Sequence, residues 1–242
     1  MTTVTDVERA VAGRPPAATR RSAQIWIVTA SALVGAAILL EAAAGEPPST
    51  SPGLIDWMED NRAALIVLDE VLVFAALALG AAAFSARRAI GQQMSERMVA
   101  AHGLVGLTAV MMFVTSLAGG RFVYPVHDIS VEDENSAALV AGLFFGGQHM
   151  VWLLLGGVTL AIAAGARRVS SAGFRWASVA VALCAIAGSY PDVLGPVATV
   201  IVRMTFVIWL GGLAAAGPRA QAGPRARGRG RERRRGAGAA DK

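Results

Sequence analysis

The sequence predicts an all-α, polytopic membrane protein: a six-helix transmembrane bundle with both chain ends in the cytoplasm. Three observations lead to this prediction. The 242 residues are 55% hydrophobic and 16% charged, whereas soluble domains are about 25% charged. The apolar residues gather in six segments, most of them near the roughly 20 residues that a spanning helix needs. Lysine and arginine are concentrated in alternate connections between these segments, which is typical of loops that stay inside the cell.

The chain divides into three parts. Residues 1–24 are mostly polar and contain two prolines and four arginines, so we expect a flexible cytoplasmic arm. Residues 25–216 form the transmembrane domain. Its predicted spanning segments are residues 25–44, 63–84, 98–119, 137–165, 174–189 and 193–216. The fifth is the shortest, and the sequence leaves open whether it crosses the membrane completely.

The third part, residues 217–242, is rich in glycine and arginine. We expect a disordered cytoplasmic tail that is attracted to anionic lipid, at about 1 kcal/mol for each basic residue near the surface. Runs of this kind also bind nucleic acid in other proteins, but we do not expect nucleic acid as a partner here.

The orientation follows from the basic residues. Nineteen of the 22 lysines and arginines lie in the four parts of the chain that this topology places inside. The connections placed outside hold only Arg62 and Arg121 and are otherwise acidic. The positive-inside rule therefore predicts a multi-pass protein of the cell membrane with cytoplasmic N and C termini.

An acidic pair, Asp69 and Glu70, interrupts the apolar run of residues 63–84. A charge at the centre of a membrane helix costs about 2.5–3.5 kcal/mol on insertion scales, so such residues need a partner, a proton or water. Counted from the arginines at the cytoplasmic ends of their helices, Asp69, His149 and Arg203 lie 16–18 residues deep. That spacing equals roughly 24–27 Å of helix, which is the outer half of the membrane core.

Four segments therefore bring polar groups to one outer layer. The candidate residues for binding or proton exchange are Glu41, Asp69, Glu70, Gln148, His149 and Arg203. His149 shares a helical stripe with Gly142, Gly146 and Gly156, and such small residues favour close helix packing. We therefore expect this stripe to face the bundle. We also expect Asp69, His149 and Arg203 to form one connected network, with Asp69 as the charge partner of Arg203.

Three functions fit such a layer. The first is binding or translocation of a small solute, lipid or proton, with Asp69 and His149 exchanging protons and Arg203 holding an anionic group. The second is an intramembrane enzyme acting on a lipid or isoprenoid, with Asp69 or Glu70 as general acid and His149 as base. The third is a structural subunit of a membrane assembly, in which the glycine stripe is a contact face. A buried ion-pair cluster that only fixes helix registry is the alternative to any of these sites.

The sequence excludes or disfavours several other classes. The single lysine, Lys242, lies in the tail, so a retinal Schiff base within the bundle is excluded. The single cysteine, Cys184, has no partner for an internal disulfide. There is no phosphate-cradling loop and no nucleophile-elbow motif. We expect no metal and no cofactor. The expected partners are membrane lipids, a small solute or lipid ligand, and further copies or other subunits in an oligomer.

Overall fold

The computed structural model describes residues 17–90, 96–124, 133–165 and 171–216, and its regular elements in these ranges are helices. The long helices are α2 (Ala17–Ala44), α4 (Arg62–Ile90), α5 (Glu96–Gly120), α6 (Glu134–Gly165) and α9 (Pro196–Ala216). The shorter helices are α3 (Ser51–Asp60), α7 (Ala172–Ala187) and α8 (Pro191–Leu194). The prediction of an all-α protein is confirmed for this part of the chain.

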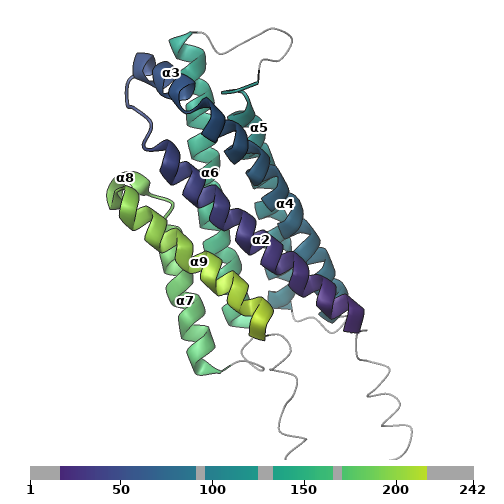
Figure 1. Ribbon diagram of the computed structural model, residues 1–242. Coiled ribbons are helices and arrows are strands. Elements are labelled where there is room, and N and C mark those ends of the chain that lie inside the picture. The colour runs from purple at the N-terminus through teal and green to yellow at the C-terminus, as the bar shows by residue number, and fades with distance from the viewer. Residues whose placement is uncertain (1–16, 91–95, 125–132, 166–170, 217–242) are drawn as a thin grey trace, which may run out of the picture.

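Six helices form a closed ring in chain order (Figure 1). Each of α2, α4, α5, α6, α7 and α9 packs against the next, and α9 packs back against α2. Two side chains of α2 also bond to α9: the Ser31 hydroxyl donates to the Val207 carbonyl at 2.8 Å, and the Gln24 amide donates to the Ala214 carbonyl at 3.0 Å. The ring is therefore held together where the first and last long helices meet.

The interior of the ring is lined largely by small and aliphatic side chains. Ala30 of α2 and Ala75 of α4 are completely buried, and these two helices share the most extensive helix contact of the bundle. Small side chains let helices approach closely, which is how helices associate in lipid. The larger interior side chains, among them Leu68 and Phe206, fill the space that the alanines leave.

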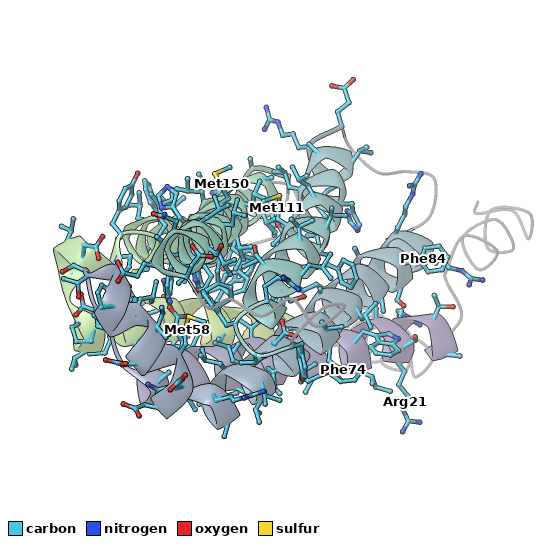
Figure 2. The ribbon with its side chains drawn as sticks, turned by 90° about the horizontal axis from the view of Figure 1, so that it is seen from above. Arg21, Met58, Phe74, Phe84, Met111 and Met150 are labelled. Atoms are coloured by element: carbon cyan, nitrogen blue, oxygen red, sulfur yellow. The ribbon has the colours of Figure 1, made fainter. Side chains whose placement is uncertain are left out.

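The outer surface of the bundle is strongly apolar. Phe74 and Phe84 of α4 are more than half exposed (Figure 2), as are Leu117 of α5 and Ile208 of α9. In water such a surface would be unfavourable, whereas lipid tails solvate it well. Within the described residues, five helices are long and apolar enough to cross a membrane, namely α2, α4, α5, α6 and α9. The chain is therefore a membrane protein, as the sequence indicates.

The fifth predicted segment became α7, which has only sixteen residues. At 1.5 Å per residue it measures about 24 Å, less than the roughly 30 Å core of a bilayer. The Ser171 hydroxyl caps its first turn by accepting from the Phe174 amide, and Gly188 ends it. Among the described helices, five are both long enough and apolar enough to span a membrane, and α7 is not one of them. The number of six spanning helices therefore stays a prediction. In the fold, α7 packs beside α6 and α9 (Figure 1), and the residues just after it meet the middle of α6, where His149 bonds to the Ser189 carbonyl.

The helices differ from the prediction in three ways. Helix α2 begins at Ala17, so residues 17–24 are helical rather than part of a flexible arm. The sixth predicted segment is divided, because Gly195 adopts a φ of 73° between α8 and α9, and Pro196 begins the new helix. Helix α3 was not expected, because it is too short to span and carries three acidic residues. It covers α6 at the end of the bundle opposite the start of α2, and this end is called the α3 end below.

Candidate functional site

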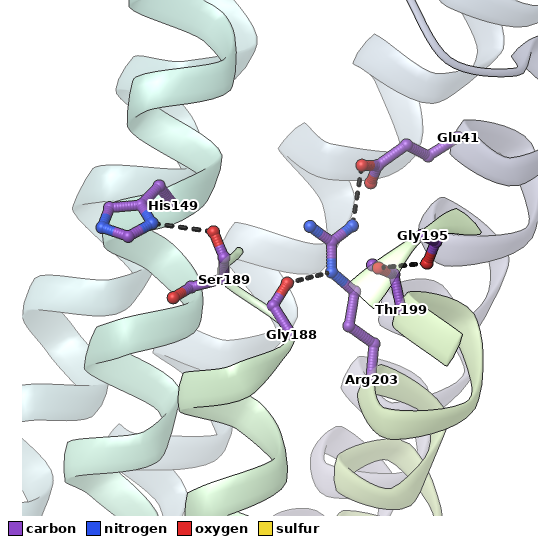
Figure 3. A network of polar contacts seen from close by, with 7 residues as sticks. All are labelled: Glu41, His149, Gly188, Ser189, Gly195, Thr199 and Arg203. Carbon is purple, nitrogen blue, oxygen red and sulfur yellow. Dashed lines mark hydrogen bonds and ion pairs between the residues drawn. The ribbon is translucent and has the colours of Figure 1, made fainter. Parts of the chain in front are cut away.

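Arg203 is the centre of the polar layer. It lies about two turns into α9, and its side chain is only 4% exposed. Its Nε donates to the Gly188 carbonyl at 2.8 Å, and its Nη1 donates to Glu41 Oε1 at 2.7 Å (Figure 3). The guanidinium carbon lies 5.1 Å from the centre of the Trp152 ring, which is cation–π distance. Three helices therefore supply the groups that compensate one buried charge.

Gly188 lies so close to Arg203 that a side chain would not fit at this position. A Cβ atom at this position would lie 2.9 Å from Arg203 Cγ and 3.1 Å from Val202 Cγ2. The first distance is too short for carbon atoms, so a larger residue would push α7 and α9 apart. Glycine thus allows the end of α7 to approach α9 closely enough for its carbonyl to accept from the arginine.

Glu41 also binds α6. The Gln148 side-chain amide faces the two carboxylate oxygens of Glu41. These oxygens only accept hydrogen bonds, so the amide nitrogen, which donates, must point toward them. In that orientation the nitrogen donates to Oε1 at 3.1 Å and to Oε2 at 2.9 Å. Glu41 therefore joins α2 to α9 through Arg203 and to α6 through Gln148. We call Glu41, Gln148, Trp152 and Arg203 the Glu41 cluster.

His149 lies next to the cluster but bonds to a different group. Its Nδ1 is 2.8 Å from the Ser189 carbonyl, one residue after the carbonyl that accepts from Arg203 (Figure 3). Because a carbonyl only accepts, Nδ1 carries the hydrogen of this bond. The ring also meets Tyr190 edge-on, with centroids 4.8 Å apart. The end of α7 is thus fixed by α6 on one side and by α9 on the other.

Asp69 takes no part in these hydrogen bonds. Its side chain is 9% exposed, and its Oδ1 is buried without a hydrogen-bond partner. The carboxyl lies against the last turn of α5, where a Cβ on Gly120 would be 3.2 Å from Oδ2. The prediction that Asp69 is the charge partner of Arg203 is wrong, because the arginine pairs with Glu41. The physical reason is that Asp69 faces α5, whereas Arg203 faces α2, α6 and α7.

Glu70 is exposed, as its position about 100° further around the helix implies. It accepts from the Tyr124 hydroxyl at 3.3 Å. Tyr124 lies beyond the end of α5, outside the membrane-spanning part. Lost hydration raises the pKa of its phenol above the ordinary value, and the nearby Glu70 carboxylate raises it further. This pair links α4 to the turn after α5 at the α3 end.

The predicted glycine stripe of α6 faces two environments. Gly156 packs against α7, where a Cβ would lie 3.2 Å from the Ala182 carbonyl oxygen. Gly142 and Gly146 are exposed, and a Cβ on either would meet nothing within 4 Å. The expectation that the whole stripe faces the bundle is therefore wrong in its outer half. There, α6 contacts α5 through Gly147 and Phe144, which meet Thr115 and Gly119.

A cavity of about 30 Å³ lies beside the Glu41 cluster. Its polar lining residues are Glu41, Thr115 and Gln148. The cavity lies inside the ring and is lined by Val34, Ala37, Ile38, Glu41, Leu68, Leu72, Met112, Thr115, Gln148, Val151, Trp152 and Leu155. A single water needs at least about 10–15 Å³ on this measure, so the cavity has room for about two water molecules.

The described residues contain no group of three or more His, Cys, Asp and Glu side chains that could hold a metal ion. Comparison with known protein families, curated proteins and solved structures found no match to this chain. Trp152 and Gly188 are the site residues that sequence reasoning missed. Neither is polar in its side chain, and no spacing rule indicates that a tryptophan face or a glycine carbonyl will meet an arginine.

Proposed function

We propose that this membrane protein binds a small zwitterionic solute at the Glu41 cluster, from the α3 end of the bundle. The observation that carries the proposal is the position of the Glu41 carboxylate. It bonds to Arg203 and Gln148, it lies on the wall of the cavity, and its side chain is still 26% exposed. A purely structural ion pair would gain nothing from a cavity beside it.

The chemistry of the cluster suggests the class of ligand. A carboxylate and a guanidinium that are 2.7 Å apart present opposite charges to one small molecule. The ammonium of a zwitterion would be recognised by Glu41, and its carboxylate by Arg203, whose planar donors match carboxylate oxygens. The cavity has a volume of only about 30 Å³, so the solute would insert between the two side chains and replace their direct contact.

Binding of radiolabelled glycine to the purified protein in lipid nanodiscs tests this proposal. We expect saturable binding that is weakened in Gln148→Leu, which keeps the ion pair but removes the amide. Gln24→Leu is the matched control, since the Gln24 amide donates to the Ala214 carbonyl of the neighbouring helix α9, far from the cluster at the opposite end of the bundle. Absence of saturable binding of glycine and of larger zwitterionic amino acids to the wild-type protein would overturn the proposal.

The structural-subunit hypothesis is favoured by one separate observation. Gly142 and Gly146 lie on an exposed face of α6 with open space beside them, and exposed small residues at this spacing let a second helix approach closely. Native mass spectrometry of the protein, compared with Gly146→Leu, tests it. A mass that stays monomeric in wild-type protein would contradict the hypothesis.

The enzymatic hypothesis receives less support. It requires an acid and a base that face the same ligand. Among the described residues, Asp69 lies against α5 while His149 bonds to the end of α7, and no hydrogen bond joins them. We further propose that the protein lies in the cell membrane with lipids as its surrounding partners and with both termini in the cytoplasm, because the distribution of basic residues favours that orientation.

A further inference from the structure

The Asp69 carboxyl is the buried polar group for which the described fold supplies no partner. Its Oδ1 has no hydrogen bond, and the side chain is more than nine-tenths buried. An unpaired charge in such a place would be strongly unfavourable. Some positive species must therefore compensate the carboxylate, or the carboxyl must carry a proton.

The neighbouring backbone makes this place favourable for positive charge. The carboxyl lies against Gly119 and Gly120, the last two residues of α5, with positions for added Cβ atoms only 3.2–3.7 Å from its atoms. The C-terminal end of a helix carries a partial negative charge from its carbonyl groups. In membrane proteins, such helix ends together with carboxylates coordinate sodium ions or protons.

The charged groups around Asp69 do not neutralise it. Glu70 follows it on α4 and adds negative charge, and the Tyr124 hydroxyl donates to Glu70. Arg62, at the start of α4, donates to the Val123 carbonyl, and Arg121 has interactions of its own. On α2, Glu41 is occupied by Arg203, and α6 contributes the apolar Phe144 to this region.

We propose that Asp69 and the end of α5 form a binding site for one small monovalent cation, either a proton or a sodium ion. A single charge is inferred because the described residues near Asp69 offer no cluster of three or more ligating side chains of the kind that zinc takes. Because Gly119 and Gly120 have no side chains, the backbone of α5 lies directly against the carboxyl, while the Phe144 ring packs on Gly119. A proton would come from water, bind one carboxyl oxygen and return to water when it is released.

This site shares no residue with the Glu41 cluster, so the inference goes beyond the proposed function. Thermal unfolding of the full chain in nanodiscs tests it. Titration with sodium chloride, at ionic strength held constant by choline chloride, should raise the midpoint to a plateau if sodium is the occupant. If the occupant is a proton, sodium should have no effect, and infrared difference spectra across a pH titration should show a protonated carboxyl assignable to Asp69.

Asp69→Asn should abolish whichever of the two signals the wild-type protein gives, because the amide is neutral. Asp56→Asn is the control, since Asp56 is an exposed carboxyl on α3. If Asp69→Asn does not fold, Gly120→Ala serves instead, because its methyl group would press on Oδ2 while leaving the charge in place. It should shift the sodium or proton midpoint by tenfold or more in concentration.

A wild-type protein that shows neither sodium dependence nor a protonated Asp69 carboxyl would overturn the inference. So would signals that are unchanged in both Asp69→Asn and Gly120→Ala. Glycine binding at the Glu41 cluster is measured separately, so the failure of one proposal is distinguishable from the failure of the other.

Discussion

Arg203 and Glu41 are 162 residues apart in the chain, and their side chains meet at 2.7 Å inside the helical ring. This ion pair joins α9 to α2, the last and the first long helices, and Gln148 extends it to α6. A buried pair of this kind adds little stability over apolar side chains, but removing one partner leaves the other charge uncompensated. The pair therefore fixes how the ring closes.

Glu41→Ala should destabilise the protein by about 3–5 kcal/mol, because it leaves the buried Arg203 guanidinium without its carboxylate. Unfolding of the purified protein in detergent micelles, followed by circular dichroism, measures the change. Glu46→Ala is the control, since Glu46 is an exposed carboxylate a few residues further along. Its effect should stay within about 0.5 kcal/mol.

The double variant Glu41→Met with Arg203→Met separates an uncompensated charge from lost packing. It removes both charges and should recover most of the stability that Glu41→Ala loses. Equal stability of Glu41→Ala and Glu46→Ala would show that the arginine is compensated by some other group.

Substitution of two adjacent glycines of α6 by alanine should have opposite effects on the stability of the protein. A Cβ on Gly156 would lie 2.8 Å from Ile186 Cγ1 and 3.2 Å from the Ala182 carbonyl oxygen, which is backbone and cannot rotate away. A Cβ on Gly157 would meet only Leu104 Cδ1 at 3.8 Å, an ordinary contact. Gly156→Ala should thus destabilise the bundle by about 1–3 kcal/mol through overpacking.

Gly157→Ala should instead be neutral or stabilising by up to about 1 kcal/mol, because alanine favours the helix. Thermal unfolding of the two variants side by side measures the difference. If both glycines tolerate alanine equally, α7 does not pack on α6 as closely as the structure places it.

The Tyr124 phenol provides a test of the pairing with Glu70. Its pKa is raised above 10.0 by lost hydration and then by the Glu70 charge. A phenol whose pKa is higher in the folded state stabilises that state below pH 10, and this contribution is lost as the pH rises through the folded pKa. Glu70→Gln should therefore lower the Tyr124 pKa.

Ultraviolet titration of tyrosinate in a Tyr190→Phe background reports Tyr124 alone, because the chain has two tyrosines. Glu59→Gln, a substitution at an exposed position on α3, is the control and should leave the titration unchanged. A Tyr124 pKa that does not respond to Glu70→Gln would mean that the 3.3 Å contact does not form in the membrane.

The level of each polar residue along its helix was a useful guide to which side chains meet, but direction around each helix was predictable only in part. Counting residues from the arginines placed Glu41, Gln148 and Arg203 in one layer, and the fold brings these three together. The same counting placed Asp69 there, yet its side chain faces α5. Which helices become neighbours in a ring depends on packing among all six, and no single segment carries that information.

Small residues were a weaker guide than depth. Gly142 and Gly146 are at the spacing that favours helix contact, but they face outward, while Gly147 beside them carries the contact with α5. A glycine pattern indicates where a second helix could approach closely. Whether one does depends on the neighbouring helix and not on the pattern. Gly188 shows the same limit, since its role depends on an arginine fifteen residues later in another helix.

The orientation of the bundle in the membrane follows from where its basic and acidic residues lie. Helix α2 begins and α9 ends at the same end of the ring, opposite α3 (Figure 1). The sequence places most basic residues at this end and acidic residues at the α3 end, so we expect the former inside the cell. In a Cys184→Ser background, Glu59→Cys should react with a membrane-impermeant maleimide on intact cells. Ala18→Cys and Ala215→Cys should react only after the cells are permeabilised. Labelling of Ala215→Cys but not Ala18→Cys on intact cells would mean that the sixteen residues of α7 do not cross the membrane, and that the chain spans it five times.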